Sequence, residues 1–418
     1  MTPAQLSIIF FLQMAVIIAT CRVVGWAAHR WLGQPQVVGE MIAGVILGPT
    51  LFGAIAPATQ ALLFPPEAKS VLYVGAQLGV GLYMFIVGLE FDRNEFKASA
   101  RAAAAVSMAG MVVPFIAAAA LIPWMMSGDS GDKGLFMPQV APWQASLFLG
   151  AAIAITAFPM LARIIHERGM SGTRLGTLSL SAGAIGDAGA WVVVALVLAS
   201  LGDGPMVAVK ALGGGLAFAG LMVTLAPRWL ARMGDMAERE QGVSPSMLAI
   251  SLILFLLCAF AMDAIGIHAV FGGFLLGTAM PRGLFAKQLR AKLEPFATVF
   301  LLPMFFTFSG LNTELQLVGT GGLLAITLAV LATSILAKGG ACYIAARLSG
   351  QDHATAMGIG VLMNARGLME LIIINIGLQR GIIGAPLFAM LTLMAIVSTL
   401  MASPLFELFY RRRQPVDS

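Results

Sequence analysis

The segment Thr156-Ala-Phe-Pro159 lies close to the middle of an apolar stretch that extends from residue 143 to residue 165. A proline at this depth removes a backbone hydrogen bond and kinks or breaks an α-helix. A second segment, Asn364-Ala-Arg-Gly367, lies at the same depth of another apolar stretch, from residue 354 to residue 379. The two segments together predict a pair of interrupted helices.

The composition around these segments is typical of a membrane protein. Apolar residues make up 59% of the 418 positions and charged residues only 11%, against about 25% charged residues in a soluble domain. A helix needs about 20 apolar residues to cross a bilayer, so we expect a single all-α polytopic membrane domain with about thirteen transmembrane helices. The candidate spans are residues 5–28, 35–55, 71–90, 102–126, 143–165, 174–200, 205–227, 246–264, 266–280, 295–311, 318–346, 354–379 and 385–410.

The distribution of positive charge gives the expected orientation. Most of the 25 Lys and Arg residues fall in loops that would share one side of the membrane, whereas only Lys69, Lys133 and Arg380 fall in loops on the other side. Cytoplasmic loops carry the excess of Lys and Arg, so we expect the N-terminus outside and the C-terminus in the cytoplasm, in the inner membrane of a bacterium. The net charge of +5 is spread along the chain, which does not favour a nucleic-acid partner.

The spacing of the two interrupted segments predicts an internal repeat. They lie seven predicted spans apart, which is the offset that two six-helix repeats joined by one linker helix would give. An odd offset also reverses the orientation of the second repeat in the membrane. Inverted repeats with paired interrupted helices at mid-membrane are the architecture of many secondary transporters, in which the helix ends supply dipoles and free carbonyls to ions.

Four ionisable residues are expected at or near mid-membrane, where charge is costly and marks ion or proton pathways by default. Asp187 lies at the midpoint of the sixth span, Arg366 at the midpoint of the twelfth, Glu370 one turn beyond it, and Lys338 inward of the middle of the eleventh. Simpler readings stay open. Asp187 could form a purely structural salt bridge, Lys338 could extend to the membrane interface, and Arg366 and Glu370 could neutralise each other along one helix.

The three cysteines do not indicate a metal site or a disulfide. Cys21, Cys258 and Cys342 are far apart in the sequence, and each lies in an apolar stretch. We expect them to be core residues.

Several motifs resemble those of the monovalent cation:proton antiporter-2 family, which includes Kef-type proteins, plant cation/proton exchangers and their bacterial relatives. The resemblance extends from about residue 34 to residue 404. It rests on Gln34-Pro-Gln-Val-Val-Gly-Glu40, Gly44-Val-Ile-Leu-Gly-Pro49, Phe85-Ile-Val-Gly-Leu-Glu90, Ile155-Thr-Ala-Phe-Pro-Met-Leu-Ala-Arg-Ile164, Ala184-Ile-Gly-Asp-Ala-Gly-Ala-Trp191, His268-Ala-Val-Phe-Gly-Gly-Phe274 and Arg366-Gly-Leu-Met-Glu-Leu371.

This resemblance implies a sodium/proton antiporter-like fold, a homodimer and an elevator-like transport cycle. The core-type helices are expected at about 71–200 and 295–410, and the dimerisation or scaffold helices at about 5–55 and 205–280. The family's conserved carboxylate falls on Asp187, but its partner position is occupied by Gly186. Kef-type relatives carry a cytosolic regulatory domain after the membrane part, and we expect none within this chain.

The implied function is secondary antiport of Na⁺ or K⁺ against protons, contributing to pH homeostasis without a cofactor. Asp187 and Thr156 are the expected cation- and proton-binding residues, with Asp187 holding the transported metal ion transiently. Lys338, Arg366 and Glu370 are expected to couple the two ions. Phe158, Pro159, Asn364 and Gly367 are expected to form the breaks in the two helices.

Other classes of protein fit less well. The sequence contains no recognisable filter repeat, which an ion channel would need, so a channel or sensor on a related fold is less favoured. It also contains neither His-Glu-x-x-His nor Gly-x-Ser-x-Gly, the motifs that would indicate an intramembrane enzyme. A sodium-coupled symporter of organic anions on a similar scaffold is a nearer alternative to the antiporter.

Overall fold

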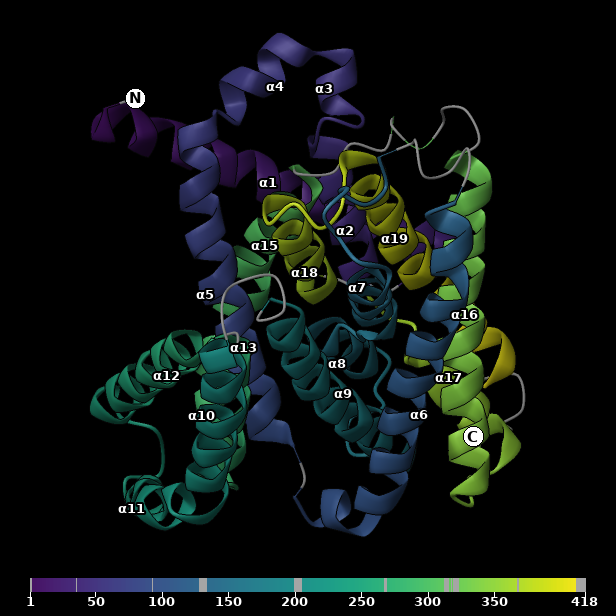
Figure 1. The fold of residues 1–418 in the computed structure, drawn as a ribbon. Helices are drawn as coiled ribbons and strands as arrows, with labels where there is room; N and C mark the ends of the chain where they lie inside the picture. Colours follow the sequence, from purple (N-terminus) through teal and green to yellow (C-terminus); the bar gives the residue numbers. More distant parts are fainter. Residues whose placement is uncertain are drawn as a thin grey trace.

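The computed structural model shows a protein built almost entirely of α-helices (Figure 1). It describes residues 2–34, 36–91, 93–127, 134–198, 205–266, 269–311, 316, 318, 323–366 and 368–410. Some side chains within the helices, including those of Asp187 and Pro159, lie outside the described part, as does all of Gly367. In the described ranges β-pairing is limited to an isolated bridge between Phe136 and Ile383.

The helices are numbered in chain order. The first ten are α1 Pro3–Leu32, α2 Gln36–Leu47, α3 Phe52–Ile55, α4 Pro57–Leu63, α5 Pro66–Glu90, α6 Arg93–Met125, α7 Pro142–Ala154, α8 Phe158–Glu167, α9 Arg174–Leu198 and α10 Pro205–Thr224. The others are α11 Ala226–Arg239, α12 Pro245–Ile265, α13 Ala269–Ala279, α14 Leu284–Phe296, the π-helical turn η3 Ala297–Leu301, α15 Leu302–Leu311, α16 Leu323–Leu348, α17 His353–Leu362, α18 Leu368–Gln379 and α19 Ala385–Phe409.

Two spans are interrupted near their middles. The helices α7 and α8 are separated by residues 155–157, and Pro159 occupies the first turn of α8, where its missing N–H group costs nothing. The helices α17 and α18 are separated by residues 363–367. The interruptions leave half-helix ends inside the apolar part of the protein, which is where the candidate site is built.

The lengths and composition of the described helices can be compared with the predicted membrane spans. Eight described helices are long and apolar enough to cross a membrane, and the bent pair α10–α11 is a ninth candidate. The remaining predicted spans fall on the interrupted helices, on the 11-residue α13 and on α9. The total of thirteen therefore stays a prediction.

The helices pack in two groups. One, which we call the scaffold group, contains α1, α2, α5 and α12 to α15, with extensive contacts of α5 on α13 and of α2 on α15. The other, the bundle group, contains α6 to α9 and α16 to α19, with α6 packed on α7, α9 and α16. Figure 1 shows α5, α12 and α13 on one side and α6, α16 and α17 on the other. Residues 71–90 and 295–311, where core-type helices are expected, make their main contacts with the scaffold group. The division into core-type and dimerisation helices stays a prediction.

Glycine pairs bring the scaffold helices into direct backbone contact. A Cβ atom on Gly310 of α15 would lie 2.0 Å from the carbonyl carbon of Gly44 on α2, and one on Gly277 of α13 would lie 2.8 Å from Cα of Gly88 on α5. Small residues allow such close approach of membrane helices. In the predicted numbering of spans, one pair joins the second span to the tenth and the other joins the third span to the ninth. The inverted repeat itself stays a prediction.

We expect Gly310→Ala to destabilise the protein by about 1–3 kcal/mol, because the added methyl group meets backbone that cannot rotate away. The matched control is Gly340→Ala, since nothing lies within 4 Å of a Cβ atom at this helical position. Thermal denaturation in detergent should show a lower midpoint for the first variant and an unchanged or higher one for the second. Equal midpoints would contradict the packing argument.

Candidate functional site

The two interrupted segments cross each other and are joined by hydrogen bonds. The Ala157 N–H group donates to the Ala365 carbonyl oxygen over 3.0 Å. The Thr156 hydroxyl donates to the Met363 carbonyl oxygen over 3.1 Å, and the Thr156 side chain is buried. Residues more than 200 positions apart therefore fix the crossing, and they place Thr156 at its centre.

Two buried cations bind the last carbonyl groups of α7. Arg366 donates from Nη1 to the Ala152 carbonyl oxygen over 2.9 Å and from Nη2 to the Ile153 carbonyl oxygen over 2.7 Å. Lys338 donates from Nζ to the Ala154 carbonyl oxygen. The last carbonyls of a helix have no partner within the helix and carry partial negative charge. Lys338 and Arg366 therefore stabilise the interruption electrostatically, and Lys338 does not extend to the membrane interface.

Arg366 is also paired with Glu370. Nη1 of Arg366 lies 3.5 Å from Oε1 of Glu370, and both side chains are fully buried. Oε2 of Glu370 and Nε of Arg366 have no hydrogen-bond partner in the described part of the chain. The mutual neutralisation of Arg366 and Glu370 that the sequence allowed is present, but Arg366 lies in the interruption before α18 and binds the end of α7 at the same time.

Thr399 of α19 is a site residue that the sequence did not indicate. Its Oγ1 accepts a hydrogen bond from the Arg366 N–H group over 2.8 Å and lies 3.0 Å from the Arg366 carbonyl oxygen. A single threonine in an apolar span carries no signal of such a role. Its contribution is to hold the backbone of the second interruption in place.

Asn364 contributes a free acceptor beside the crossing. Its Nδ2 donates to the Gly360 carbonyl oxygen over 3.0 Å, whereas its buried Oδ1 has no partner among the described residues. Buried polar atoms are normally paired. An unpaired acceptor at this position is therefore available to a cation.

The helix α9, which carries Asp187, packs against both α8 and α6. A Cβ atom at Gly183 would lie 3.0 Å from Cδ2 of Leu161 and 3.4 Å from Cδ2 of Phe158, both in the first turns of α8. A Cβ atom at Gly186 would lie 3.3 Å from Oγ of Ser107 on α6. The backbone at Asp187 thus lies between the crossing and α6, and the Asp187 side chain lies outside the described part.

Phe158 forms an apolar contact between the two helix groups. Its ring lies 4.9 Å from that of Phe274 on α13, in an edge-to-face arrangement. Phe274 also packs edge-to-face against Phe91, with ring centroids 5.4 Å apart. These three rings close the boundary between scaffold and bundle beside the start of α8.

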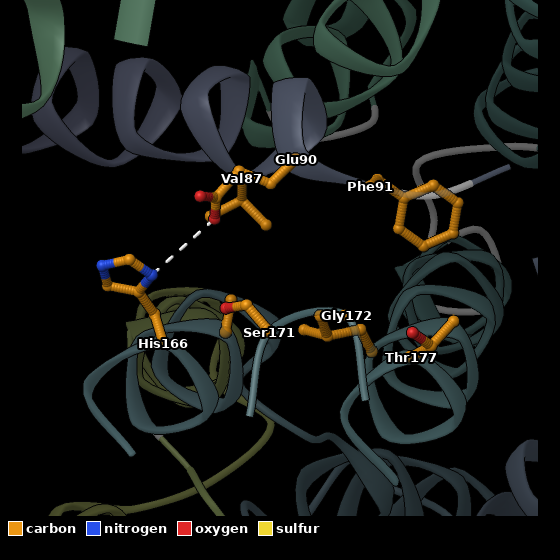
Figure 2. Close-up of a pocket in the computed structure, with 9 residues that line it drawn as sticks. Val87, Glu90, Phe91, His166, Ser171, Gly172 and Thr177 are labelled. Atoms are coloured by element: carbon orange, nitrogen blue, oxygen red, sulfur yellow. Dashed lines mark ion pairs between the residues drawn. The ribbon is translucent and has the colours of Figure 1, made fainter. Parts of the chain in front are cut away.

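A small pocket lies at the other end of α8 (Figure 2). Glu90 at the end of α5 faces His166 at the end of α8, with Oε2 of Glu90 3.7 Å from Nδ1 of His166. Ser171 and Thr177 contribute hydroxyl groups to the lining. Because α8 has ten residues, the pocket and the crossing are separated by about 15 Å along the helix.

A buried ion pair lies between the pocket and the crossing. Nη2 of Arg163 on α8 lies 3.8 Å from Oε1 of Glu40 on α2, and Nε of Arg163 lies 2.6 Å from Oε1 of Glu167. The guanidinium carbon also lies 5.9 Å from the centre of the Tyr83 ring on α5. This pair joins the bundle to the scaffold and was not expected from the sequence.

Comparison with known proteins shows which family this chain is similar to. The family model described as "Sodium/hydrogen exchanger, transmembrane" matches residues 15–409. The chain is 36% identical over 401 residues to the Na(+)/H(+) antiporter NhaS4 of Synechocystis, covering 95% of this chain and 96% of that protein. It is 27% identical to the Na(+)/H(+)-K(+) antiporter GerN of Bacillus cereus, covering 95% of both chains.

Some relatives are longer, and a solved structure supports the fold. The chain is 31% identical to the K(+)/H(+) antiporter 1 of Saccharomyces cerevisiae, covering 96% of this chain but only 46% of that protein. The solved structure of the sodium proton antiporter MjNhaP1 from Methanocaldococcus jannaschii has a TM-score of 0.60 at 15% identity, covering 94% and 97% of the two chains. The all-α antiporter-like fold predicted from the sequence is therefore confirmed.

Proposed function

This chain belongs to the sodium/hydrogen exchanger family, and from that premise we propose that it is a secondary antiporter exchanging Na⁺ or K⁺ for protons through Asp187. The observation that carries the proposal is the crossing of the two interrupted helices, with Lys338 and Arg366 bound to the carbonyl groups that end α7. Such a crossing offers both helix dipoles and unpaired oxygens at one depth. The protein itself is an integral membrane transporter and not an enzyme.

The expected position of Asp187 agrees with this role. Asp187 follows Gly183 by four residues on α9, so the two share one face of the helix. That face packs on Phe158 and Leu161, where α8 begins. Helix N-termini favour negative charge, so a carboxylate on this face is stabilised next to the start of α8 when neither a proton nor a cation is bound.

The exchange follows from competition for one carboxylate. In our proposal Asp187 binds either a proton or a dehydrated cation, and Thr156 and the free Oδ1 of Asn364 supply further oxygens. Lys338 pairs with Asp187 when the cation is absent and returns to the Ala154 carbonyl when the cation binds. Arg366 and Glu370 hold the two half-helices at a constant separation while the charge at Asp187 alternates.

Alternating access is proposed to arise from movement of the bundle group against the scaffold group. The contacts within each group are far more extensive than the contacts of α8 with α2 and α5. We propose a homodimer in a bacterial inner membrane, with the N-terminus outside and the C-terminus inside. The transported ions are substrates, and no cofactor is required for such a cycle.

Sodium and potassium are both candidate substrates in this proposal. Relatives carry printed names with Na(+)/H(+), K(+)/H(+) and Na(+)/H(+)-K(+). Both ions accept carboxylate, hydroxyl and carbonyl ligands, so the chemistry of the proposed ligands does not separate them.

Purified protein in sealed proteoliposomes with an imposed pH gradient tests the proposal. Na⁺, K⁺ and Li⁺ are each tested alone. We expect Na⁺, K⁺ or both to drive proton movement, whereas choline should not drive it. Protein-free liposomes should show no cation-driven proton movement. Proton movement without a cation requirement would contradict antiport. Uptake of an organic anion together with Na⁺ would identify the symporter instead, and a large cation current would identify a channel.

A further inference from the structure

Ser107 of α6 carries a buried hydroxyl group that has no partner in the described part of the chain. The side chain is 1% exposed, and its Oγ has no hydrogen-bond partner among the described residues. A helical serine ordinarily donates to the carbonyl oxygen one turn earlier. Leaving a buried hydroxyl unpaired costs about 1–3 kcal/mol, so a partner that this structure does not contain is the simplest explanation.

The surroundings of Ser107 indicate what that partner is. Its Oγ would lie 3.3 Å from a Cβ atom at Gly186, and Gly186 directly precedes Asp187. Consecutive residues on a helix point about 100° apart, so Asp187 can bind an ion on the side of α9 that faces α6. An ion bound there would contact the Ser107 hydroxyl. Cys342 Sγ on α16 contacts the carbonyl oxygen of Val106, the residue before Ser107, over 3.6 Å. Lys338 lies one turn before Cys342 on the same helix.

Two other buried hydroxyls lie further from Asp187 along its own helix. Ser179 and Ser181 on α9 also lack partners in the described part of the chain, but they lie eight and six residues before Asp187, or about 12 Å and 9 Å along the helix. Ser107 therefore differs from them in its position rather than in its burial. Gly186 leaves the space between the two helices open for this hydroxyl.

We propose that Ser107 is a direct ligand of the transported monovalent cation, supplying an oxygen from α6 that the glycine at position 186 cannot supply from α9. The inference rests on the proposed exchange at Asp187 and adds the residue that completes its cation site. Because a hydroxyl group does not ionise in this pH range, Ser107 in this proposal ligates the cation and does not itself carry the exchanged proton.

The test compares Ser107→Ala with the swap Ser107→Ala/Gly186→Ser, which moves the hydroxyl to α9 within the same space. The single variant should raise the half-saturating concentration of Na⁺ or K⁺ about tenfold, the effect of losing one hydrogen-bond-like contact to a charged group, with little change in the maximal rate. The swap should recover most of the loss. Ser181→Ala, which removes an equally buried hydroxyl, should leave the half-saturating concentration unchanged.

A second measurement is independent of transport. The rise in melting temperature on adding Na⁺ or K⁺ to detergent-purified protein reports binding to the folded state, and it should require about tenfold more cation in Ser107→Ala. If that variant does not fold, Ser107→Cys keeps the shape with a weaker ligand and should give the same direction of change. Unchanged cation dependence in both measurements, or a loss of maximal rate alone, would overturn the assignment. A wild-type protein without cation-driven proton flux would overturn the proposed function, and this inference with it.

Discussion

Replacing Asp187 by asparagine is expected to abolish cation/proton exchange and to leave the protein folded. The amide has the shape of the carboxyl group but can neither bind a proton at neutral pH nor neutralise a cation. Lys338 keeps the Ala154 carbonyl oxygen as a partner when Asp187 is replaced, so the substitution should not lower the melting temperature. Proteoliposomes under an imposed pH gradient should show no flux above that of protein-free vesicles with either Na⁺ or K⁺.

Two control variants separate the loss of charge from general damage. Asp187→Glu keeps the carboxylate and should retain measurable exchange, although the longer side chain alters the ion site. Asp235→Asn removes an exposed carboxylate on α11 and should behave as the wild type. Cation-driven proton flux that persists in Asp187→Asn at the wild-type rate would refute the proposed mechanism.

The second large effect is expected at Arg366. Arg366→Met leaves Glu370 buried without its cation and leaves two carbonyl groups of α7 without donors. Removing one member of a buried ion pair typically costs about 3–5 kcal/mol. We therefore expect a strongly lowered midpoint of thermal denaturation in detergent, together with loss of exchange as the crossing opens.

The double variant Arg366→Met/Glu370→Gln makes this prediction specific. Removing the second charge should recover part of the stability, because an uncharged side chain is cheaper to bury than an isolated carboxylate. Arg290→Gln, at a partly exposed ion pair with Glu90 and Glu294, should cost no more than about 1 kcal/mol. A double variant less stable than Arg366→Met would contradict the account of this buried pair.

The features predicted successfully from the sequence are those that depend on local chemistry. Apolar stretches of bilayer length identified the all-α membrane class, and Pro159 marked the start of a half-helix because a proline cannot continue the preceding hydrogen-bond ladder.

The high density of charged residues in two other segments led to a wrong prediction of their secondary structure. The segments that form α11 and α14 were expected to be loops, yet they are helices in which Leu230, Met233, Leu289 and Leu293 are buried under their charged faces.

The contacts of the candidate site depend on packing between distant helices, which the sequence does not specify. The binding of Arg366 to the end of α7 joins positions more than 200 residues apart, and the roles of Thr399 and Ser107 depend on which face each helix presents. The pairing of Lys338 with Asp187 stays a prediction, because the Asp187 side chain lies outside the described residues. What the structure adds is a second partner for Lys338, the carbonyl group of Ala154.

The glycine pairs of the scaffold have a consequence for how the protein responds to its lipid environment. Where Gly44 meets Gly310 and Gly88 meets Gly277, backbone touches backbone, and no side chain can change its rotamer to let the helices tilt against each other. A bilayer of unsuitable thickness is usually accommodated by tilting of helices or by deformation of the lipid. The glycine contacts restrict the tilting of these helices relative to one another, so we expect more of the adaptation to bilayer thickness here to come from thinning or thickening of the surrounding lipid.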